Sequence, residues 1–555
     1  MSRVDAREVE SSITAPPLRV EHPPVDIRLV DIRRGTTCEP LHMKRVTGAV
    51  LGVVSACVAL GAAHLVAAFV GSESSPVVAV GSAAIDLTPE WLKSFAIRTF
   101  GEQDKIVLLA GVGVVIALLA IGLGSASVRR PRTGLIGLAL LAAVGLAAAL
   151  TRPTATALDA LPSLIGAVAG AATLLGVRVR LMAPREARET AEASDTPFPD
   201  GVDRRRFFVS SGVALGVAAA AGAFGQFLSR RSQADVSRAA VTLPEPADDA
   251  PTVPGGVDLT VDGLSPYYTP NADFYRVDTA LIVPSVPAED WSLRVHGMVA
   301  NELTLDFEQL ISRPLIERDI TLACVSNEVG GPYVGNARWV GAPLADLLDE
   351  AGVDPAATQL VSTAVDGFTI GTPVQAVTDG RDAMLAVGMN GEPLPVEHGF
   401  PVRMVVPGLY GYVSATKWLV DLELTTFDAF DPYWIRRGWA EQAPIKTQSR
   451  IDTPKPLARV PAGEAVIAGV AWAQHTGIDA VEVRVDDGEW QQADLADENT
   501  IDTWRQWKIV ATLAPGNRTV EVRATDATGE TQTDQRAEPF PSGATGQHSV
   551  VIQVD

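Results

Sequence analysis

Cysteine and basic residues are scarce in this chain of 555 residues, which has three cysteines and a net charge of −21. Three cysteines cannot supply an iron–sulfur cluster with four cysteine ligands, and the sequence has no Cys-x-x-Cys-His haem attachment run. It also lacks a Gly-rich phosphate loop, a His-Glu-x-x-His motif and an ordered Ser/His/Asp set. The acidic excess argues against nucleic acid as a partner.

Charge-free apolar runs are abundant, by contrast, and they raise the mean hydropathy to +0.17. We predict that they are transmembrane helices, because each approaches the length needed to cross a hydrocarbon core of ~30 Å. The five runs without Asp, Glu, Lys or Arg are 46–70, 106–128, 133–150, 160–177 and 207–228. Two of them have only 18 residues, so four spans with one re-entrant or interfacial segment are the alternative.

The distribution of basic residues around these runs predicts their orientation. Basic clusters lie at 44–45, 129–132 and 178–206, and they alternate along the chain with loops that have fewer basic residues. The positive-inside rule places all of these clusters in the cytoplasm. We therefore expect a disordered cytoplasmic tail at 1–43, a four-helix transmembrane region at 44–180, and an extracytoplasmic location for everything after residue 228. The chain would then be a multi-pass protein of the cell membrane.

The fifth apolar run carries a second signal. Arg204-Arg205-Arg206-Phe207-Phe208 precedes its Ala/Gly/Val-rich stretch and resembles a twin-arginine export signal placed internally, and such signals move folded proteins. The alternative is that the three arginines only follow the positive-inside rule. We interpret 181–232 as a cytoplasmic linker and a fifth transmembrane helix with this twin-arginine-like motif.

Two further segments follow the membrane region. Residues 233–263 are rich in Pro, Asp and Ala and are predicted to be a tether. Between 264 and 452, strand-like runs such as 291–295 and 360–363 alternate with short helical patterns such as 344–351. This alternation predicts a mixed α+β domain.

The last segment, 453–555, has a different pattern. It contains short apolar runs, several with period-two alternation, and turn residues separate them. Asp486-Asp487-Gly488 is a hairpin signal between two of these runs. We therefore predict an immunoglobulin-like β-sandwich.

Cys324 is the only cysteine outside the membrane half of the chain. A single thiol in an exported domain has no disulfide partner there, so its sulfur is a candidate metal ligand or nucleophile. The alternative is a small buried hydrophobe. From roughly 265 to 555, ordered motifs around this cysteine resemble the sulfite oxidase family of molybdopterin enzymes. They are Thr269-Pro270-Asn271-Ala272-Asp273-Phe274-Tyr275, Thr321-Leu322-Ala323-Cys324-Val325-Ser326-Asn327, Trp339-Val340-Gly341-Ala342-Pro343-Leu344, Met389-Asn390-Gly391-Glu392-Pro393-Leu394-Pro395, His398-Gly399-Phe400-Pro401-Val402-Arg403, Val406-Pro407-Gly408 and Lys417-Trp418.

The resemblance implies that 264–452 is a catalytic domain that binds molybdopterin, the molybdenum cofactor, and is loaded before export. Cys324 matches the family's molybdenum ligand, since a thiolate is a soft donor suited to that metal. Cations must hold the pterin phosphate, because a buried anion without them is strongly disfavoured. The residues that match those positions are His398, Arg403 and Lys417, and those expected to line the pterin are Asn271, Phe274 and Arg276. The last segment resembles the family's dimerisation domain. The resemblance therefore implies a homodimer through this segment, although its residues alone do not indicate one.

Departures from the family pattern bear on the substrate. The family follows its ligand cysteine with Ala-Gly-Asn-Arg-Arg, whereas this chain has Val325-Ser326-Asn327-Glu328-Val329, which replaces positive charge with negative beside the metal. Trp439 falls at the position of the family's active-site tyrosine and is a catalytic candidate, although an indole cannot relay a proton as a phenol does. The run Arg276-Val277-Asp278-Thr279 also differs from eukaryotic members. These changes disfavour sulfite.

The sequence thus predicts a membrane-anchored, extracytoplasmic molybdenum–pterin oxidoreductase that transfers an oxygen atom to or from a small substrate. A sulfoxide reductase of the same fold, or a cofactor-free surface-binding protein on the same scaffold, are the alternatives. The predicted spans contain a single histidine, His64, so a bis-histidine haem within them would need another. The expected electron partner is a separate electron-transfer protein or a quinone.

Overall fold

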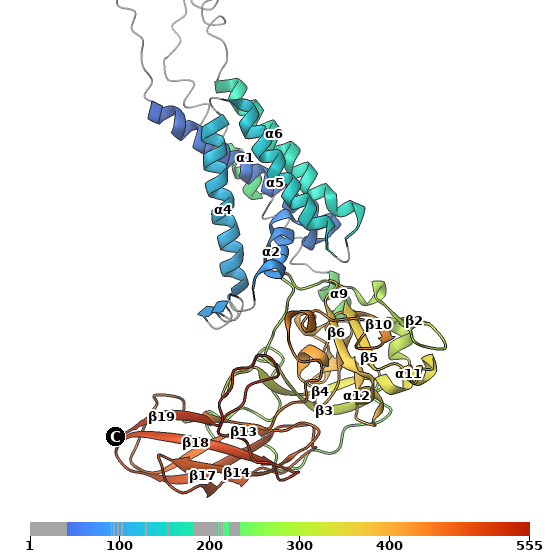
Figure 1. The fold of residues 1–555 in the computed structure, drawn as a ribbon, viewed down its shortest axis with the longest axis vertical. Coiled ribbons are helices and arrows are strands. Elements are labelled where there is room, and N and C mark those ends of the chain that lie inside the picture. The colour runs from blue at the N-terminus through green and yellow to red at the C-terminus, as the bar shows by residue number, and fades with distance from the viewer. Residues whose placement is uncertain are drawn as a thin grey trace, which may run out of the picture.

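The computed structural model describes residues 41–181 and 233–555, with gaps at 90–91, 93–94, 97–98, 101–103, 128–129 and 153–154. It also describes residues 209, 212–213, 215–220 and 222. A helical bundle, a mixed domain and an all-β region follow one another along the chain (Figure 1). The predicted tail up to residue 40 and the motif at 204–208 lie outside the described residues, as does most of the predicted span at 207–228.

The bundle contains the four predicted spans that the structure describes. Val46–Val70, Lys105–Ser127, Arg132–Leu150 and Ala157–Gly176 are each long and apolar enough to cross a membrane. The helices and short 3-10 turns of the bundle are α1 (Leu41–Val70), η1 (Ser72–Ser74), α2 (Pro76–Leu87), α4 (Asp104–Ser127), α5 (Pro131–Leu150), η3 (Ala157–Ala160) and α6 (Leu161–Leu181).

Small residues bring these helices together. A Cβ atom built on Gly52 of α1 would lie 2.0 Å from the carbonyl oxygen of Ala120 in α4, and one on Gly166 of α6 would lie 2.7 Å from that of Ala59. Larger side chains at these glycines would force the backbones apart. Close approach through small residues is how membrane helices gain packing contacts, because burial from lipid gives little driving force.

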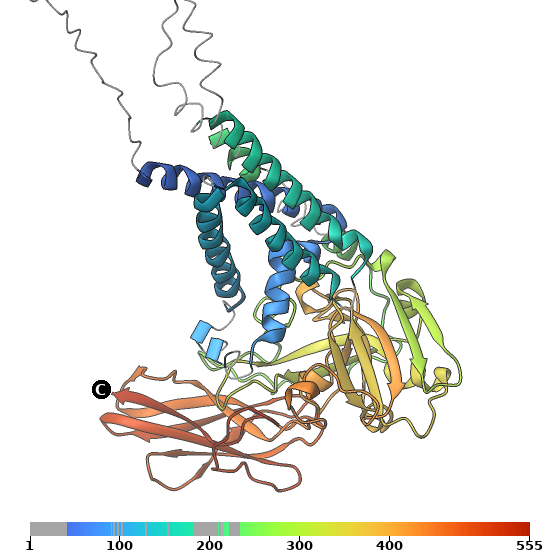
Figure 2. The ribbon, with the colours of Figure 1, turned by 45° about the horizontal axis from the view of Figure 1, so that its top comes forward.

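Helix α2 lies between the first two predicted spans, in residues 71–104, where the sequence predicts an extracytoplasmic loop. The helix begins with Pro76 after Ser75, a favourable first-turn position for proline, and its 12 residues are too few to span a bilayer. Arg152 Nη1 contacts the Glu73 carboxylate at 2.9 Å and so connects η1 to the segment before η3. In both views α2 descends from the bundle onto the mixed domain (Figures 1 and 2).

The mixed domain contains two β-sheets with short helices beside them, as the α+β pattern predicts. In the first sheet, β1 is parallel to β10 and the other pairs are antiparallel. Its order is β2 (Leu303–Asp306), β1 (Ser292–Gly297), β10 (Leu419–Thr425), β5 (Gln359–Ala364) and β6 (Thr369–Pro373). The second sheet has the order β3 (Ile316–Ala323), β4 (Val334–Pro343), β7 (Met384–Met389) and β8 (Glu392–Pro393), with β9 (Arg403–Val405) paired to β7. The helices are α10 (Phe307–Ile311), α11 (Leu344–Ala351) and α12 (Val374–Thr378), and 3-10 turns occur at η4 (Ala288–Asp290), η5 (Val396–His398), η6 (Gly411–Val413) and η7 (Ile435–Arg437).

Residues 233–263, predicted as a tether, lie against the mixed domain instead of extending from it. Helix α9 (Gln233–Ala240) buries Ala234 completely, and Arg238 Nε donates to the carbonyl of Leu394 at 2.8 Å. Further on, the backbone N–H of Ala247 donates to the carbonyl of Leu315 at 2.8 Å. The sequence predicts a tether here because the segment is rich in Pro, Asp and Ala. The contacts that hold it are with residues far along the chain, and such contacts leave no pattern in the local sequence.

The C-terminal region has two sheets that share one apolar core, to which Ile467, Trp507, Val483 and Val522 contribute. One sheet has the order β11 (Gln448–Thr453), β13 (Gly463–Trp472), β17 (Arg505–Leu513) and β16 (Asp494–Leu495). The other has β12 (Arg459–Val460), β19 (His548–Val554), β18 (Gly516–Asp526), β14 (Ile478–Val485) and β15 (Gln491–Gln492). The predicted hairpin connects β14 to β15, with Asp486 at a φ of 55°. This region is β-rich as expected, and its immunoglobulin-like character stays a prediction.

A buried polar network joins the sandwich to strand β3. Asp319 on β3 accepts hydrogen bonds from Arg338 at 2.8 and 2.9 Å, from Tyr268 at 2.7 Å and from Asn499 of the sandwich at 2.8 Å. Four donors satisfy this carboxylate, as burial requires. Because β3 leads directly into Cys324, the network fixes the strand that carries the candidate ligand.

Candidate active site

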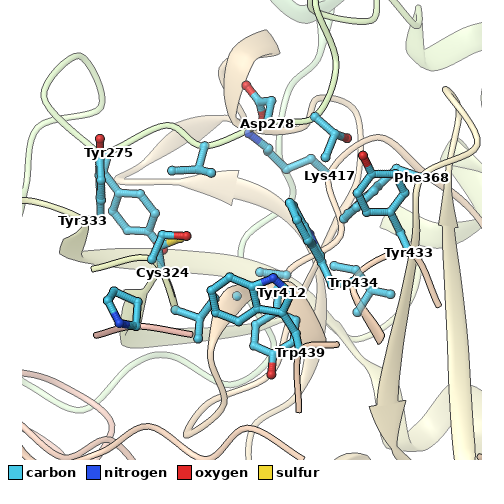
Figure 3. Close-up of a pocket in the computed structure, with 18 of the residues that line it drawn as sticks. Tyr275, Asp278, Cys324, Tyr333, Phe368, Tyr412, Lys417, Tyr433, Trp434 and Trp439 are labelled. Atoms are coloured by element: carbon cyan, nitrogen blue, oxygen red, sulfur yellow. Dashed lines mark ion pairs between the residues drawn. The ribbon is translucent and has the colours of Figure 1, made fainter. Parts of the chain in front are cut away.

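One cavity of about 820 Å³ lies beside Cys324, and all three parts of the chain line it. Figure 3 shows Cys324 beside Tyr275 and Tyr333, with Trp434, Trp439 and Tyr412 grouped across the space and Lys417 paired with Asp278 at its far side. The bundle contributes Ile85, Thr88, Leu92, Ala96, Lys105 and Leu108. The sandwich contributes Glu538, Pro539 and Phe540 from the connection between β18 and β19.

Cys324 follows β3 at the start of a tight loop. Its backbone N–H donates to the carbonyl of Tyr333 at 3.0 Å, and the Asn327 side-chain oxygen accepts from the Tyr333 N–H at 2.8 Å. These bonds close the loop and leave the thiol on the cavity side (Figure 3). Burial raises the pKa of the Cys324 thiol, although hydrogen bonds from Ser326 oppose the rise. The thiol is therefore protonated at neutral pH, and a bound metal ion would displace its proton.

Three basic side chains lie at one end of the cavity. Arg403 is on β9, His398 ends η5, and Lys417 precedes β10. Gly399 makes this grouping possible, because its φ of 113° turns the chain sharply. A Cβ on Gly399 would also lie 3.1 Å from the Cβ atoms of both Arg403 and Lys417. The motif around His398 is thus a folded unit that positions cations.

Arg403 is buried with few partners. One Nη1 bond, of 3.1 Å, goes to the carbonyl of His398, and the guanidinium lies 4.9 Å from the centroid of Trp339. Its Nε–H finds no hydrogen-bond partner among the described residues. Burial lowers the pKa of Arg403 to about 10, and no acidic side chain forms an ion pair with it in the described part of the chain. A buried cation with an unused donor fits a site for an anionic ligand.

His398 is held in a neutral form. Its Nε2–H donates to the backbone carbonyl of Asn271 at 3.0 Å, and burial lowers its pKa to about 4. Nδ1 is then the nitrogen available to a ligand, and it can donate only when the ring is protonated. A bound phosphate would supply the negative charge that favours this protonation.

Lys417 differs from Arg403 because it has an acidic partner. It forms an ion pair with Asp278, which Arg276 Nε also contacts at 2.8 Å. Burial lowers the pKa of Lys417 to about 8 in spite of this pair. Burial opposes ionisation of Asp278 too, but Lys417 and Lys105 hold its pKa below the ordinary value. Asp278, noted from sequence only as a departure from the family, is therefore what keeps Lys417 charged.

Two residues expected to line the pterin have other positions. The Asn271 side chain donates to Glu392 at 2.6 Å and accepts from Asn390 at 2.8 Å, so only its backbone carbonyl, bonded to His398, serves the site. Arg276 does not line the cavity and acts on it through Asp278. Phe274, by contrast, lines the cavity, and its ring lies 5.6 Å from that of His398. The resemblance that suggested these residues matches motifs along the chain and does not tell which side chains of the segment face the cavity.

The opposite end of the cavity is aromatic. The Trp439 ring centroid lies 5.7 Å from Tyr412, 6.1 Å from Trp434 and 5.3 Å from Phe540. Its indole N–H is buried and has no hydrogen-bond partner among the described residues. Trp439 therefore lies in the cavity wall, as the spacing from His398 predicts, with a donor free for a ligand.

Some lining residues were missed from sequence. Tyr275 lines the cavity, and burial together with the nearby Cys324 raises the pKa of its phenol far above the ordinary value, so it stays a neutral hydrogen-bond donor. Its position next to Phe274 in the quoted motif was the available signal. Lys105 and Phe540 come from segments far away in sequence, and no local pattern marks them.

Comparison with known proteins agrees with the geometry. Residues 280–434 match the family model "Oxidoreductase molybdopterin binding domain". The chain is 29% identical to human mitochondrial sulfite oxidase over 303 residues, covering 46% of this chain and 55% of the relative. It is 34% identical to the "Uncharacterized oxidoreductase YuiH" of Bacillus subtilis (strain 168) over 149 residues, covering 27% of this chain and 72% of the relative. The chain spans about half the length of the mammalian relatives. Among solved structures, the sulfane dehydrogenase SoxCD from Paracoccus pantotrophus aligns at 24% identity and a TM-score of 0.47, covering 53% of this chain and 85% of that one.

Proposed function

The chain belongs to the sulfite oxidase family of molybdopterin oxidoreductases, and we propose that it is a membrane-anchored, extracytoplasmic enzyme that transfers an oxygen atom on a small uncharged or cationic organic substrate. The observation that carries the proposal is one cavity lined both by the Cys324 thiol and by buried Arg403, whose Nε–H has no partner among the described residues. A metal ligand and an anion site in one cavity are what a metal–pterin cofactor requires.

The residues present fit that cofactor. Cys324 would bind molybdenum through its sulfur, while Arg403, Lys417 and protonated His398 would hold the pterin phosphate. When bound, the cofactor would supply two-electron oxygen-atom transfer, which amino acids cannot perform. The chain's own contribution is to orient these groups and to exclude water. Phe274 and Trp339 do the latter, since both rings are buried against the basic cluster.

The charge of the cavity supports an uncharged or cationic substrate. Glu328 and Asp366 line it, and the three basic residues are expected to be occupied by the cofactor. Carboxylates repel a sulfite dianion, and the repulsion is strong where water is scarce. The aromatic rings of Trp434, Trp439 and Tyr412 favour an apolar or cationic group in the same space.

Reduction of a sulfoxide is the second candidate, and the Trp439 indole favours it. The indole N–H is a buried donor without a partner among the described residues, and an S=O oxygen would accept a hydrogen bond from it. Tyr275 lines the same cavity beside Cys324 and is a second neutral donor there, because its phenol stays protonated (Figure 3). Neither residue needs to lose its proton for this role.

Metal analysis tests the proposal. Full-length protein purified from a host that makes molybdopterin should contain about one molybdenum per chain, and Cys324→Ser should lose it. Cys57→Ser, which changes the thiol in α1, is the matched control and should keep the metal. A full complement of molybdenum in the Cys324→Ser protein would refute the ligand assignment, and absence of pterin fluorescence after acid extraction of the wild type would favour a cofactor-free binding protein.

Substrate class is tested with the same protein. Uncharged sulfides and sulfoxides should change the electron paramagnetic resonance signal of the metal more effectively than sulfite does. Glu328→Arg, which restores a positive charge where the family has one, should shift the preference toward sulfite. A wild-type response to sulfite alone would contradict the proposed class.

A further inference from the structure

The bundle and the mixed domain are joined by polar contacts at the membrane end of the cavity. The Asp86 carboxylate, near the end of α2, accepts from the Tyr433 hydroxyl at 3.0 Å and from Arg437 Nη2 at 3.2 Å. Arg437 also stacks on the Tyr433 ring, with 3.5 Å between its guanidinium carbon and the ring centroid. On the other helix, Lys105 Nζ donates to the carbonyl of Ala280 at 2.7 Å.

These contacts adjoin the part of the cavity where Lys417 lies beside Phe368 and Trp434 (Figure 3). Ile85, Thr88, Lys105 and Leu108 from the bundle line this part together with Phe368, Tyr433 and Trp434. The three aromatic rings form a connected group, with 5.3 Å between Phe368 and Tyr433 and 5.0 Å between Tyr433 and Trp434. One cavity therefore runs from Cys324 to the ends of α2 and α4.

The membrane end of this cavity lies where the hydrocarbon of a bilayer would begin. Lys105 is the first residue of the candidate span Lys105–Ser127, and the lining residue Leu108 is inside that span. The outer surface there is apolar, with Leu87 83% and Ile106 67% exposed. Exposed large apolar residues beside a span indicate contact with lipid or with a lipid-soluble molecule.

We propose that this membrane end of the cavity binds the ring of a lipid-soluble quinone, which enters from the bilayer past the ends of α2 and α4. The planar ring stacks on the aromatic group at Tyr433 and Trp434, and Lys105 donates to a quinone carbonyl oxygen. The inference rests on the proposed function, for which it identifies the electron partner. A ligand with an apolar tail and a planar polar ring matches the combination of an apolar rim, aromatic walls and one cation.

The electron count agrees with such a partner. Oxidation of the substrate by water gives the oxygenated product, two electrons and two protons, and a quinone takes up two electrons and two protons to become a quinol. The sum moves oxygen from water to substrate and two hydrogens to the quinone. The predicted spans hold one histidine, His64, so these spans alone cannot bind a bis-histidine haem as an alternative carrier.

Two carboxyl groups at this end can exchange the protons. Asp366 lines the cavity, and Glu73 in η1 is close enough for the two charges to interact. Burial and the charge of Asp366 raise the pKa of Glu73 to about 7, although Arg152 opposes the rise. A lining carboxyl group that interacts with a second group titrating near neutrality can pass protons out of the cavity.

The test is equilibrium binding of decylubiquinone to the full-length protein in detergent, measured by isothermal titration calorimetry. Wild type should bind, and Lys105→Met should weaken binding about ten-fold or more. Ile85→Phe, which fills the cavity and leaves the contacts of Asp86 and Lys105 intact, should weaken it similarly. The matched control is Leu118→Phe, at an exposed position of α4 remote from the cavity, and it should bind as wild type does.

Equal binding by all four proteins, or no binding by wild type, would overturn the inference. Equal displacement of the quinone by decanol would overturn it too, because it would show a site for an acyl chain without recognition of the ring. The same titration on Cys324→Ser protein should give unchanged binding, since no contact with the ring involves the metal. Failure of the quinone site is thereby separated from failure of the proposed function, which molybdenum analysis decides.

Discussion

Replacement of Arg403 by methionine should have opposite effects on folding and on cofactor retention. In the cofactor-free protein the guanidinium is buried with one hydrogen bond, one aromatic contact and an Nε–H without a partner in the described part of the chain. The lowering of its pKa to about 10 corresponds to a cost of about 3 kcal/mol for keeping the guanidinium charged. Loss of the contact with the Trp339 ring and loss of the hydrogen bond to the His398 carbonyl each cost about 1 kcal/mol. Arg403→Met should therefore stabilise the cofactor-free protein by about 1 kcal/mol.

Thermal unfolding of full-length protein in detergent measures this change. Protein from a host that makes no molybdopterin should unfold several degrees higher as Arg403→Met than as wild type, since ~1 kcal/mol shifts the midpoint of a domain of this size by ~2–4 °C. In a host that makes the cofactor, the variant should retain at least about ten-fold less of it after dialysis, because a charge-assisted bond to phosphate is lost.

Arg338→Met is the matched control. Arg338 has a carboxylate partner, Asp319, at 2.8 and 2.9 Å, and its removal leaves that buried charge with fewer donors. This variant should therefore unfold at a lower temperature with or without the cofactor. If Arg403→Met also lowers the unfolding temperature of the cofactor-free protein, or retains the cofactor as wild type does, the assignment of Arg403 as an unpaired anion-binding cation is wrong.

Two further residues give predictions with direct measurements. Trp439→Phe removes a buried donor without a partner, so the unfolding temperature should stay the same or rise slightly while turnover falls about ten-fold or more; unchanged turnover would remove Trp439 from the site. Burial lowers the pKa of His398 to about 4. Below pH ~6.5 the histidine therefore binds a proton in the unfolded chain but not in the folded protein. This residue should destabilise the cofactor-free protein by up to about 3 kcal/mol as pH falls from about 6.5 toward 4. His548, with its pKa also lowered to about 4 by burial, contributes with the same sign. Glu73, with its pKa raised to about 7, contributes with the opposite sign in both proteins. His398→Gln should therefore lose less stability than wild type as pH falls from 7 to 5, and a slope equal to that of wild type would contradict the prediction.

Local sequence patterns predicted the elements that local physics determines. The helix at 344–351 and the strand at 360–363 appear where expected, because an apolar stripe and a β-branched run each specify one conformation. The four described spans follow from length and lack of charge. Cys324, His398, Arg403 and Lys417 do line one cavity, but it was the ordered resemblance to a family that grouped them.

Contacts between distant segments could not be predicted in this way. Lys105 and Ala280 are 175 residues apart, and Asp86 and Tyr433 are 347 apart. Neither pair belongs to a repeat, a periodic face or a turn motif. The sequence of one segment therefore does not predict its contact with the other. The same reason explains why residues 233–263 were taken for a tether, and why α2 was taken for a loop.

The basic cluster and the aromatic end of the cavity share one property that the sequence does not show. Arg403 Nε and Trp439 Nε1 are both buried donors without partners among the described residues, and His398 is held neutral by burial. Each of the two donors without a partner costs about 1–3 kcal/mol in the cofactor-free protein, and a ligand oxygen within hydrogen-bond distance would remove that cost. A domain built for packing alone would fill such positions with apolar side chains of the same volume, which are as stable or more so. The two donors that line or adjoin the cavity are therefore candidate ligand contacts, and bound cofactor should stabilise this domain.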